Sequence, residues 1–196
     1  MFRSKKMAKF RSVRTGYVKD YLWQSRLRVM LAWIIEIIIV VAVAFGVVYY
    51  FGRQVTVTDD SMEPTLSVQQ KLLVNSAATT FVDPKRGDII AFRSGNDENS
   101  AILIKRIIGL PGETVQIVGG QIYINDSLYV EDRGFPAITN PGLAESKIKL
   151  GGTEYFVLGD SRNNSEDSRH VDIGNVDKER IIGKVWAKLN PFSVIK

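Results

Sequence analysis

The feature that most constrains this chain is a long apolar run over residues 29–51, in which Glu36 is the only charged residue. A helix needs about 20 apolar residues to cross the hydrocarbon core of a bilayer, and this run supplies about that number. Inside lipid every backbone group must pair within its own segment, so the many β-branched residues do not prevent helix formation. Trp33 and Tyr49 to Phe51 are aromatic residues of the kind that gather at membrane interfaces. The run therefore predicts a transmembrane helix.

A cleavable signal peptide is the alternative interpretation of this run, because Ala42 and Ala44 form a small-x-small pattern. The apolar residues continue beyond that pattern to Phe51, whereas the apolar core of a signal peptide spans about 7–15 residues. We therefore expect an uncleaved anchor.

The segment before the anchor is strongly basic, with Asp20 as its only acidic residue, and the whole chain carries a formal net charge of +5. Such a segment suits either a nucleic-acid-binding arm or the cytoplasmic flank of a membrane helix. The anchor favours the second. We predict a single-pass cell-membrane protein with a basic cytoplasmic tail (1–28), a transmembrane helix (29–51) and an extracytoplasmic domain (52–196), in contact with lipid and without a nucleic-acid partner.

Composition excludes several kinds of site. The chain has no Cys, which rules out disulfides, thiol nucleophiles and thiolate metal sites. His170 is its only histidine, so a multi-histidine metal site is impossible and a Ser-His-Asp triad would need that residue. We predict no metal and no cofactor.

The outer domain has the pattern of a mainly β protein. Gly119-Gly120 separates two apolar runs, which is a strong hairpin signal. Residues 131–150 have no period, and residues 159–169 form a polar loop. We predict a curved, partly closed antiparallel β architecture behind the anchor. The expected strands are 54–58, 71–75, 89–92, 101–109, 114–118, 121–125, 128–130, 154–158 and 181–189.

The first candidate cluster is the heptapeptide 60–66, which follows the anchor closely. Pro64 fixes its own φ and disfavours helix in the residue before it. Ser61 is therefore expected at a strand end or in a turn, with its hydroxyl free. Taken alone, this stretch is better explained by a serine that makes only local turn hydrogen bonds.

The second cluster is Lys105-Arg106 within an apolar strand. Side chains alternate along a strand, so Lys105 shares a face with Leu103 and Ile107. A lysine in apolar surroundings has a lowered pKa and can act as a general base. The alternative is a lysine on an edge strand whose amine reaches solvent.

The third cluster, residues 159–169, is dense in hydroxyls, carboxylates and arginines. It is consistent with a solvated loop held by weak surface ion pairs. Its acidic spacing does not match an EF-hand calcium loop. It is also consistent with support for a site, through bidentate Arg–carboxylate pairs and a hydroxyl that orients the lysine amine.

In this order behind an anchor, the three clusters and Arg86-Gly87-Asp88 resemble bacterial type I signal peptidases (peptidase family S26) in their short, single-anchor form. The resemblance implies a signal-peptidase/LexA-like β fold and cleavage of signal peptides after Ala-x-Ala sites. The matching motifs are residues 61–66, 86–88, 105–112 and 159–169.

The resemblance also implies roles for individual residues. Ser61 would be the nucleophile, its N–H an oxyanion donor, and Lys105 the general base. Ser165 would orient the lysine amine. The supporting pairs would be Asp160 with Arg106 and Asp167 with Arg169, and the residues shaping substrate pockets would be Val57, Met62, Leu66 and Ile104.

Asp59 departs from the family pattern, which has Gly or Ser two positions before the nucleophile. An ionised carboxylate cannot donate a hydrogen bond to an oxyanion and would repel its developing charge. This departure leaves open a non-catalytic factor for pilus or surface-protein assembly. A self-cleaving, DNA-binding repressor is the other alternative, and the anchor argues against it. The implied partners are signal peptides of exported preproteins and the secretion translocon.

Overall fold

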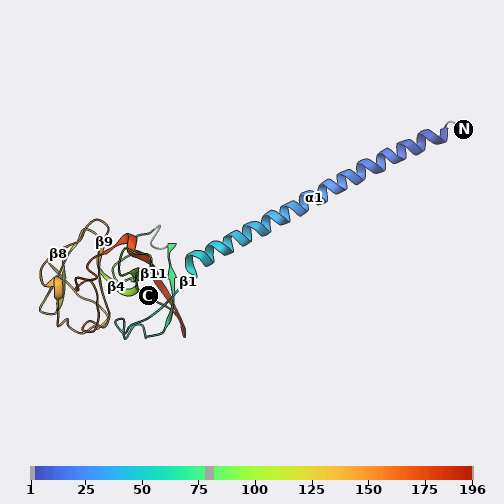
Figure 1. Cartoon of the computed structure of the whole chain (residues 1–196). Coiled ribbons are helices and arrows are strands. Elements are labelled where there is room, and N and C mark those ends of the chain that lie inside the picture. The colour runs from blue at the N-terminus through green and yellow to red at the C-terminus, as the bar shows by residue number, and fades with distance from the viewer. Residues whose placement is uncertain (1–2, 78–81, 196) are drawn as a thin grey trace. The chain divides into compact units, whose positions relative to one another are not determined.

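A computed structural model describes residues 3–77 and 82–195 of the chain, which divide into two compact units, 1–47 and 48–196. The first unit consists of most of helix α1 (Arg3–Phe51) (Figure 1). Its segment Arg26–Phe51 is long and apolar enough to cross a membrane. The helix thus continues through the basic segment as well as the predicted span.

The second unit contains a large antiparallel sheet with strand order β1-β2-β11-β3-β4-β9-β10, and β12 pairs with β11. Strand β4, which carries Lys105, lies between β3 and β9 and is not an edge strand. The strands are β1 (Arg53–Thr56), β2 (Lys71–Asn75), β3 (Ile89–Arg93), β4 (Ile102–Gly109), β9 (Glu154–Leu158), β10 (Val176–Asp177), β11 (Ile181–Leu189) and β12 (Phe192–Val194).

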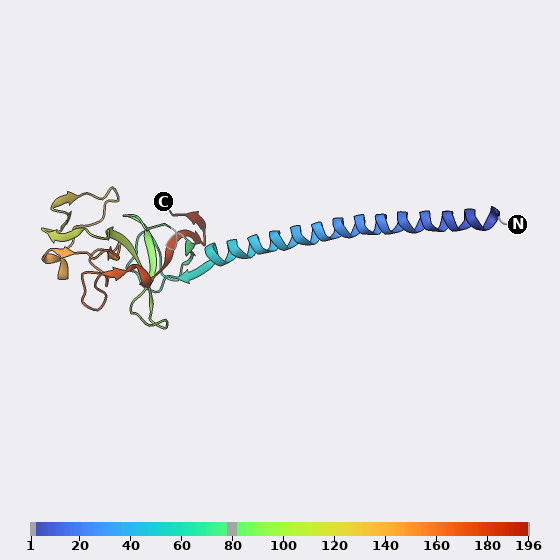
Figure 2. The ribbon, with the colours of Figure 1, turned by 90° about the horizontal axis from the view of Figure 1, so that it is seen from above.

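A smaller antiparallel sheet has the order β7-β6-β5-β8. Its strands, yellow to orange, group together at one end of the second unit (Figure 2). Gly119 and Gly120 have φ of 59° and 77° and join β5 to β6, so the predicted hairpin is confirmed. The elements are β5 (Thr114–Val118), β6 (Gln121–Ile124), β7 (Ser127–Tyr129), β8 (Ile148–Lys149) and the 3-10 helices η1 (Gly142–Glu145) and η2 (Lys178–Arg180).

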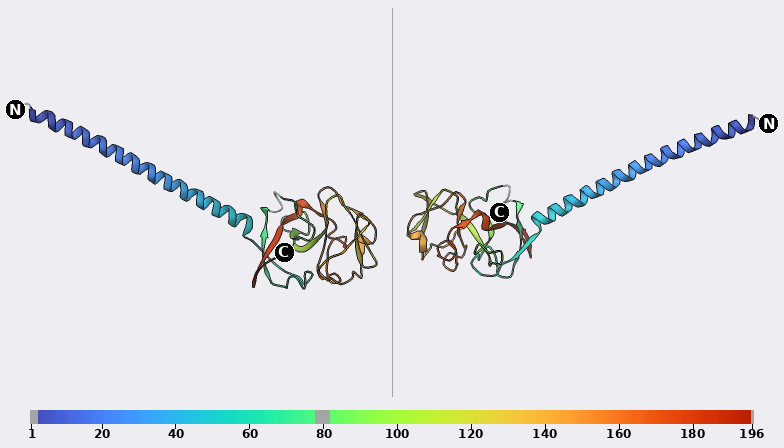
Figure 3. Two further views of the ribbon diagram at one scale, coloured as in Figure 1. Left: turned by 180° about the vertical axis from the view of Figure 1, so that it is seen from behind. Right: turned by 45° about the horizontal axis from the view of Figure 1, so that its top comes forward.

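Irregularities in the register curve the large sheet. Register shifts occur in β11 against both β2 and β3, and in β4 against β9. Such bulges bend a strand and increase its twist. Gly183 lies at one of them, where a Cβ would approach the Asn75 carbonyl oxygen to 2.7 Å. The mainly antiparallel β class is confirmed, and the strand order closes neither sheet among the described residues. Figure 3 shows the strands of the second unit from two further sides.

Three apolar clusters fill the unit. One lies between β1, β2, β3, β4 and β11 and includes Met62 and Leu66 from the turn after β1. The others pack around the small sheet and around β9 and β10. The buried face of the Ser61 turn is thereby fixed against the large sheet, beside β4.

Candidate active site

Ser61 lies in a turn between β1 and β2, as its sequence context predicts. The Glu63 N–H donates to the Asp60 carbonyl at 3.0 Å, and the Leu66 N–H donates to the Met62 carbonyl at 2.9 Å. Met62 and Leu66 anchor the turn in the core, so the position of Ser61 depends on packing as well as on local hydrogen bonds.

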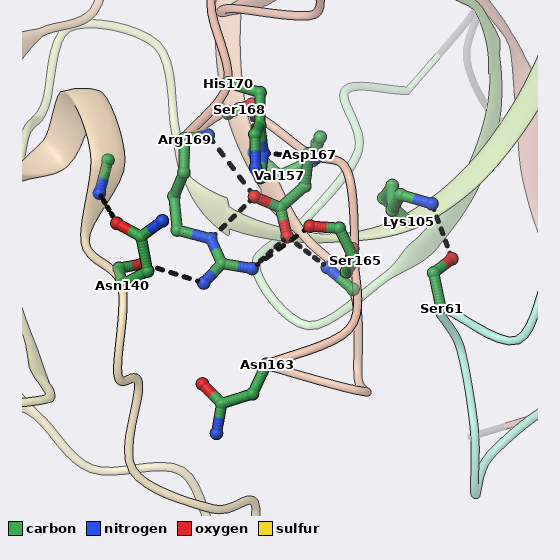
Figure 4. Close-up of polar contacts among 12 residues, drawn as sticks. Ser61, Lys105, Asn140, Val157, Asn163, Ser165, Asp167, Ser168, Arg169 and His170 are labelled. Carbon is green, nitrogen blue, oxygen red and sulfur yellow. Dashed lines mark hydrogen bonds and ion pairs between the residues drawn. The ribbon is translucent and has the colours of Figure 1, made fainter.

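Lys105 lies inside the protein, with 1% of its surface exposed. Strand β4 is paired on both sides, so the edge-lysine interpretation is wrong. The amine is near the turn that carries Ser61, and Lys105 Nζ donates to Ser61 Oγ at 2.5 Å (Figure 4). A buried amine within hydrogen-bond distance of a serine hydroxyl is the arrangement that Ser-Lys chemistry requires.

Burial lowers the pKa of Lys105 because desolvation disfavours its charged form. Asp59, and more weakly Asp167, Glu166 and Asp60, raise the pKa through their negative charges, but burial has the larger effect. The neutral amine, which can accept a proton, is therefore populated at lower pH than in an exposed lysine.

Asp59 points at Ser61. Its Oδ1 accepts hydrogen bonds from the Ser61 N–H, at 3.0 Å, and from the Ser61 hydroxyl. Its Oδ2 lies 3.8 Å from Lys105 Nζ. The Ser61 N–H, expected to be an oxyanion donor, therefore donates to the Asp59 carboxylate in this structure.

The loop after β9 forms hydrogen bonds with the turn that carries Ser61. The Ser161 N–H donates to the Ser61 carbonyl at 2.9 Å, and Asn164 Nδ2 donates to Asp60 Oδ2 at 2.8 Å. Gly159 leaves room for this approach, since a Cβ there would lie 2.6 Å from the Ser61 carbonyl oxygen. The loop therefore contributes to the position of Ser61.

Asp160 and Arg106 form a bidentate pair, with Arg106 Nε donating to Oδ1 at 2.7 Å and Nη2 to Oδ2 at 2.5 Å. Arg106 Nη1 also donates to the Gly87 carbonyl at 2.7 Å. The structure thus brings together the two residues predicted to pair, and the pair ties the loop to the strand that carries Lys105.

We expect Asp160→Ala to lower the free energy of unfolding by about 3–5 kcal/mol, because it leaves the buried Arg106 guanidinium without a counter-charge. Lys147→Ala is the control. It breaks an ion pair with Asp126 whose side chains are 55% and 71% exposed, and its cost should stay below about 1 kcal/mol. Urea denaturation of the detergent-solubilised protein measures both, and equal losses would contradict this account.

Asp167 and Arg169 also pair, with Arg169 Nε donating to Oδ1 at 2.7 Å and Nη2 to Oδ2 at 2.8 Å (Figure 4). The Gly159 N–H donates to Asp167 Oδ2 at 3.1 Å, and Arg169 Nη1 donates to the Asn140 carbonyl at 3.1 Å. The predicted pair is present and joins both ends of the loop to the segment around Asn140.

Ser165 does not make the hydrogen bond to the lysine amine that the family resemblance implies. Its Oγ is buried and has no hydrogen-bond partner among the described residues. The side chain packs against Gly159, where a Cβ would lie 2.1 Å from Ser165 Oγ. Ser165 and Lys105 nevertheless line one cavity.

We expect Ser165→Ala to slow preprotein cleavage by about tenfold, the effect of one hydrogen bond worth about 1.4 kcal/mol between the Ser165 hydroxyl and the Lys105 amine during the reaction. It should not lower the free energy of unfolding, because the lost hydroxyl has no hydrogen-bond partner among the residues that the structure describes. Ser168→Ala is the matched control, since Ser168 Oγ accepts from the Val157 N–H at 2.9 Å. That variant should lose about 1 kcal/mol. An unchanged cleavage rate in Ser165→Ala would remove Ser165 from the site.

The cavity beside the two residues has a volume of about 340 Å³. None of the four residues predicted to shape substrate pockets lines it. Met62 and Leu66 are each 0% exposed, and they belong to the same core cluster as Val57 and Ile104. In this conformation their packing stabilises the turn that carries Ser61. The cavity lining is Asp59, Asp60, Ser61, Leu103, Lys105, Thr139, Asn140, Arg162, Asn163, Asn164, Ser165, Glu166, Arg169 and His170.

Leu103 is the apolar lining residue that the sequence interpretation missed. Alternation along the strand placed Leu103 on the same face as Lys105, but Leu103 was not among the residues predicted to contact substrate. His170 lies on the cavity rim with an exposed side chain, and its Nδ1 accepts from the Asp167 N–H at 3.4 Å. In the described part of the chain, no group of three His, Cys, Asp or Glu residues could hold a metal ion.

Comparison with known proteins identifies the family. A family model for signal peptidases, peptidase S26, matches residues 30–189. A signal peptidase I of Leptolyngbya laminosa is 35% identical over 159 residues, covering 78% of this chain and 76% of that protein. A signal peptidase I of Bacillus amyloliquefaciens is 32% identical over 188 residues, covering 88% of this chain and 94% of that protein.

A solved structure of a signal peptidase I from Enterococcus faecalis V583 is 33% identical, with a TM-score of 0.40, and covers 52% of this chain and 96% of that one. By the family model and the curated relatives, the chain belongs to the signal peptidase family of serine peptidases, peptidase S26. Within that family its curated relatives are signal peptidases of type I, so the predicted family is confirmed.

Proposed function

We propose that this chain is a membrane-anchored endopeptidase that removes N-terminal signal peptides from exported preproteins, with Ser61 as nucleophile and Lys105 as general base. The observation that carries the proposal is the 2.5 Å contact between the buried Lys105 Nζ and Ser61 Oγ, in a chain of the signal peptidase family. Such Ser-Lys variants of the catalytic triad need no histidine.

In the proposed reaction, neutral Lys105 accepts the hydroxyl proton of Ser61 as Oγ attacks the scissile carbonyl carbon. The resulting lysine ammonium then donates that proton to the leaving amine, which releases the mature protein and leaves an acyl-enzyme at Ser61. Neutral Lys105 next accepts a proton from water, the hydroxide attacks the ester, and Ser61 recovers its hydroxyl. The lowered pKa of Lys105, caused by its burial, supports its assignment as the base.

The proposed substrate lies extended against the strand that leads into Ser61. Among the described strands β1 pairs with β2 only, so its other edge can bind a peptide backbone. Leu103 offers an apolar surface beside the dyad. We propose cleavage after Ala-x-Ala, the preference that the family resemblance implies.

We propose that the segment 29–51 anchors the protein, with the basic tail 1–28 in the cytoplasm and the domain 52–196 outside. The positive charge before the anchor supports this orientation. It would place the domain 52–196 on the side of the membrane where preprotein cleavage sites emerge, and the proposed partners of the protein are the lipid bilayer and the translocon. Fusing a reporter to each end of the chain tests the orientation directly.

The substrate class is tested with two preproteins that differ only at the last residue before the cleavage point, Ala in one and Phe in the other. The detergent-solubilised protein should process the first and leave the second intact. Equal processing of both would contradict the proposed specificity without affecting the dyad.

A second candidate function is a non-catalytic role in the assembly of pili or surface proteins on the same scaffold. The contact between Asp59 and the Ser61 N–H favours it, because that N–H cannot then stabilise an oxyanion. Absence of processing by a folded protein would support this role.

A further inference from the structure

Asp59 makes contact with both members of the dyad. Oδ1 accepts from the Ser61 N–H and the Ser61 hydroxyl, and Oδ2 lies 3.8 Å from Lys105 Nζ. The hydroxyl proton of Ser61 is thus directed at Asp59, while Lys105 Nζ donates to Ser61 Oγ. This is the reverse of the proton direction that attack requires, in which the lysine amine accepts from the hydroxyl.

The same contact affects the charge on Lys105. Asp59 is the foremost of the acidic groups that raise the pKa of Lys105, ahead of Asp167, Glu166 and Asp60. Arg162, Arg169 and His170 line the same cavity. The carboxylate of Asp59 therefore favours the ammonium form, which cannot accept a proton.

We propose that Asp59 is a positioning residue that restrains the dyad, and that its carboxylate must leave Ser61 before cleavage can begin. This inference rests on the proposed function. Withdrawal frees the Ser61 N–H for the oxyanion and redirects the hydroxyl proton to Lys105 Nζ once that amine has released its extra proton to solvent. The Asp59 side chain is 42% exposed, so it can turn toward water without displacing packed groups.

Asp59→Asn removes the charge and keeps an acceptor, whereas Asp59→Gly removes both. We expect kcat/KM at neutral pH to rise at least about fivefold in Asp59→Asn, since about fivefold is the effect of one unit charge about 4 Å away with the full screening of water, and the Lys105 amine is buried. The rise should be larger in Asp59→Gly, which also frees the Ser61 N–H. Both variants should lower the pKa of Lys105, so that its amine is neutral at lower pH. The acid limb of the pH profile of kcat/KM should therefore move to lower pH in both variants.

The control is Asp126→Asn, an equal charge change at an exposed turn residue, which should leave the profile unmoved. The pKa of Lys105 is measured separately, by NMR of the chain carrying ¹³C-labelled lysine, with Lys105→Met identifying the resonance. It should fall in both Asp59 variants and stay constant in the control.

An unmoved Lys105 pKa with an unmoved acid limb would overturn the proposal. Loss of cleavage in folded Asp59→Asn and Asp59→Gly would also overturn it, because Asp59 would then be required. If neither the unsubstituted chain nor any variant cleaves, the proposed function fails, and the NMR titration still decides whether Asp59 stabilises the ammonium form.

Discussion

Lys105→Met is expected to lower kcat/KM for preprotein cleavage by more than about 10⁴-fold, the scale of loss when a member of a nucleophile–base unit is removed. The only amine that donates to Ser61 Oγ in the described structure is that of Lys105, at 2.5 Å. Methionine has a similar length and no titratable group. Because it also removes a buried amine that is costly to charge, the fold should not lose stability.

The pH dependence of cleavage distinguishes loss of the general base from a change in the pKa of that base. Cleavage by the unsubstituted chain should rise with pH as Lys105 loses its proton, whereas raising the pH should not restore Lys105→Met. Lys147→Met is the matched control, at a lysine 55% exposed, and should cleave normally. Substantial cleavage by folded Lys105→Met would contradict the assignment of the base.

Ser61→Ala is expected to have an equally large effect, because it removes the atom that forms the bond to the substrate. The fold should be unchanged, since the Ser61 carbonyl still accepts from the Ser161 N–H and the turn is held by Met62 and Leu66. Ser67→Ala, at an exposed serine that ends the same turn, is the control and should retain cleavage. Chemical denaturation checks that both variants are folded.

The two changes should not be additive. Residues that act as one catalytic unit lose nearly the whole effect when either is removed, so Ser61→Ala with Lys105→Met should cleave no more slowly than either alone. A double variant slower than both by the product of their effects would indicate two independent contributions.

Local patterns predicted much of the fold. The Gly119-Gly120 hairpin and the strands β4, β9 and β11 follow from turn residues and apolar runs of ordinary length. The short strands β8, β10 and β12 were missed, because two or three residues have no detectable period and pair only when the tertiary structure brings a partner.

Local sequence patterns predicted less of the candidate site than of the fold. Whether Lys105 is buried depends on its strand having neighbours on both sides, and β9 comes from a segment far along the chain. The burial of Met62 and Leu66 likewise depends on β2 and β11, which come from later parts of the chain. These two residues, predicted to contact substrate, therefore pack in the core instead. The orientation of the Asp59 side chain toward Ser61 depends on its rotamer, which the sequence pattern does not predict.

Cleavage of a signal peptide by Ser61 can be measured as a time course of processing of one preprotein with an Ala-x-Ala site, followed by mass analysis of the new N-terminus. The unsubstituted protein and Ser61→Ala are compared in the same detergent. We expect one product, beginning immediately after the second alanine, that forms with the unsubstituted protein and not with Ser61→Ala. The same product formed at an equal rate by folded Ser61→Ala would contradict it.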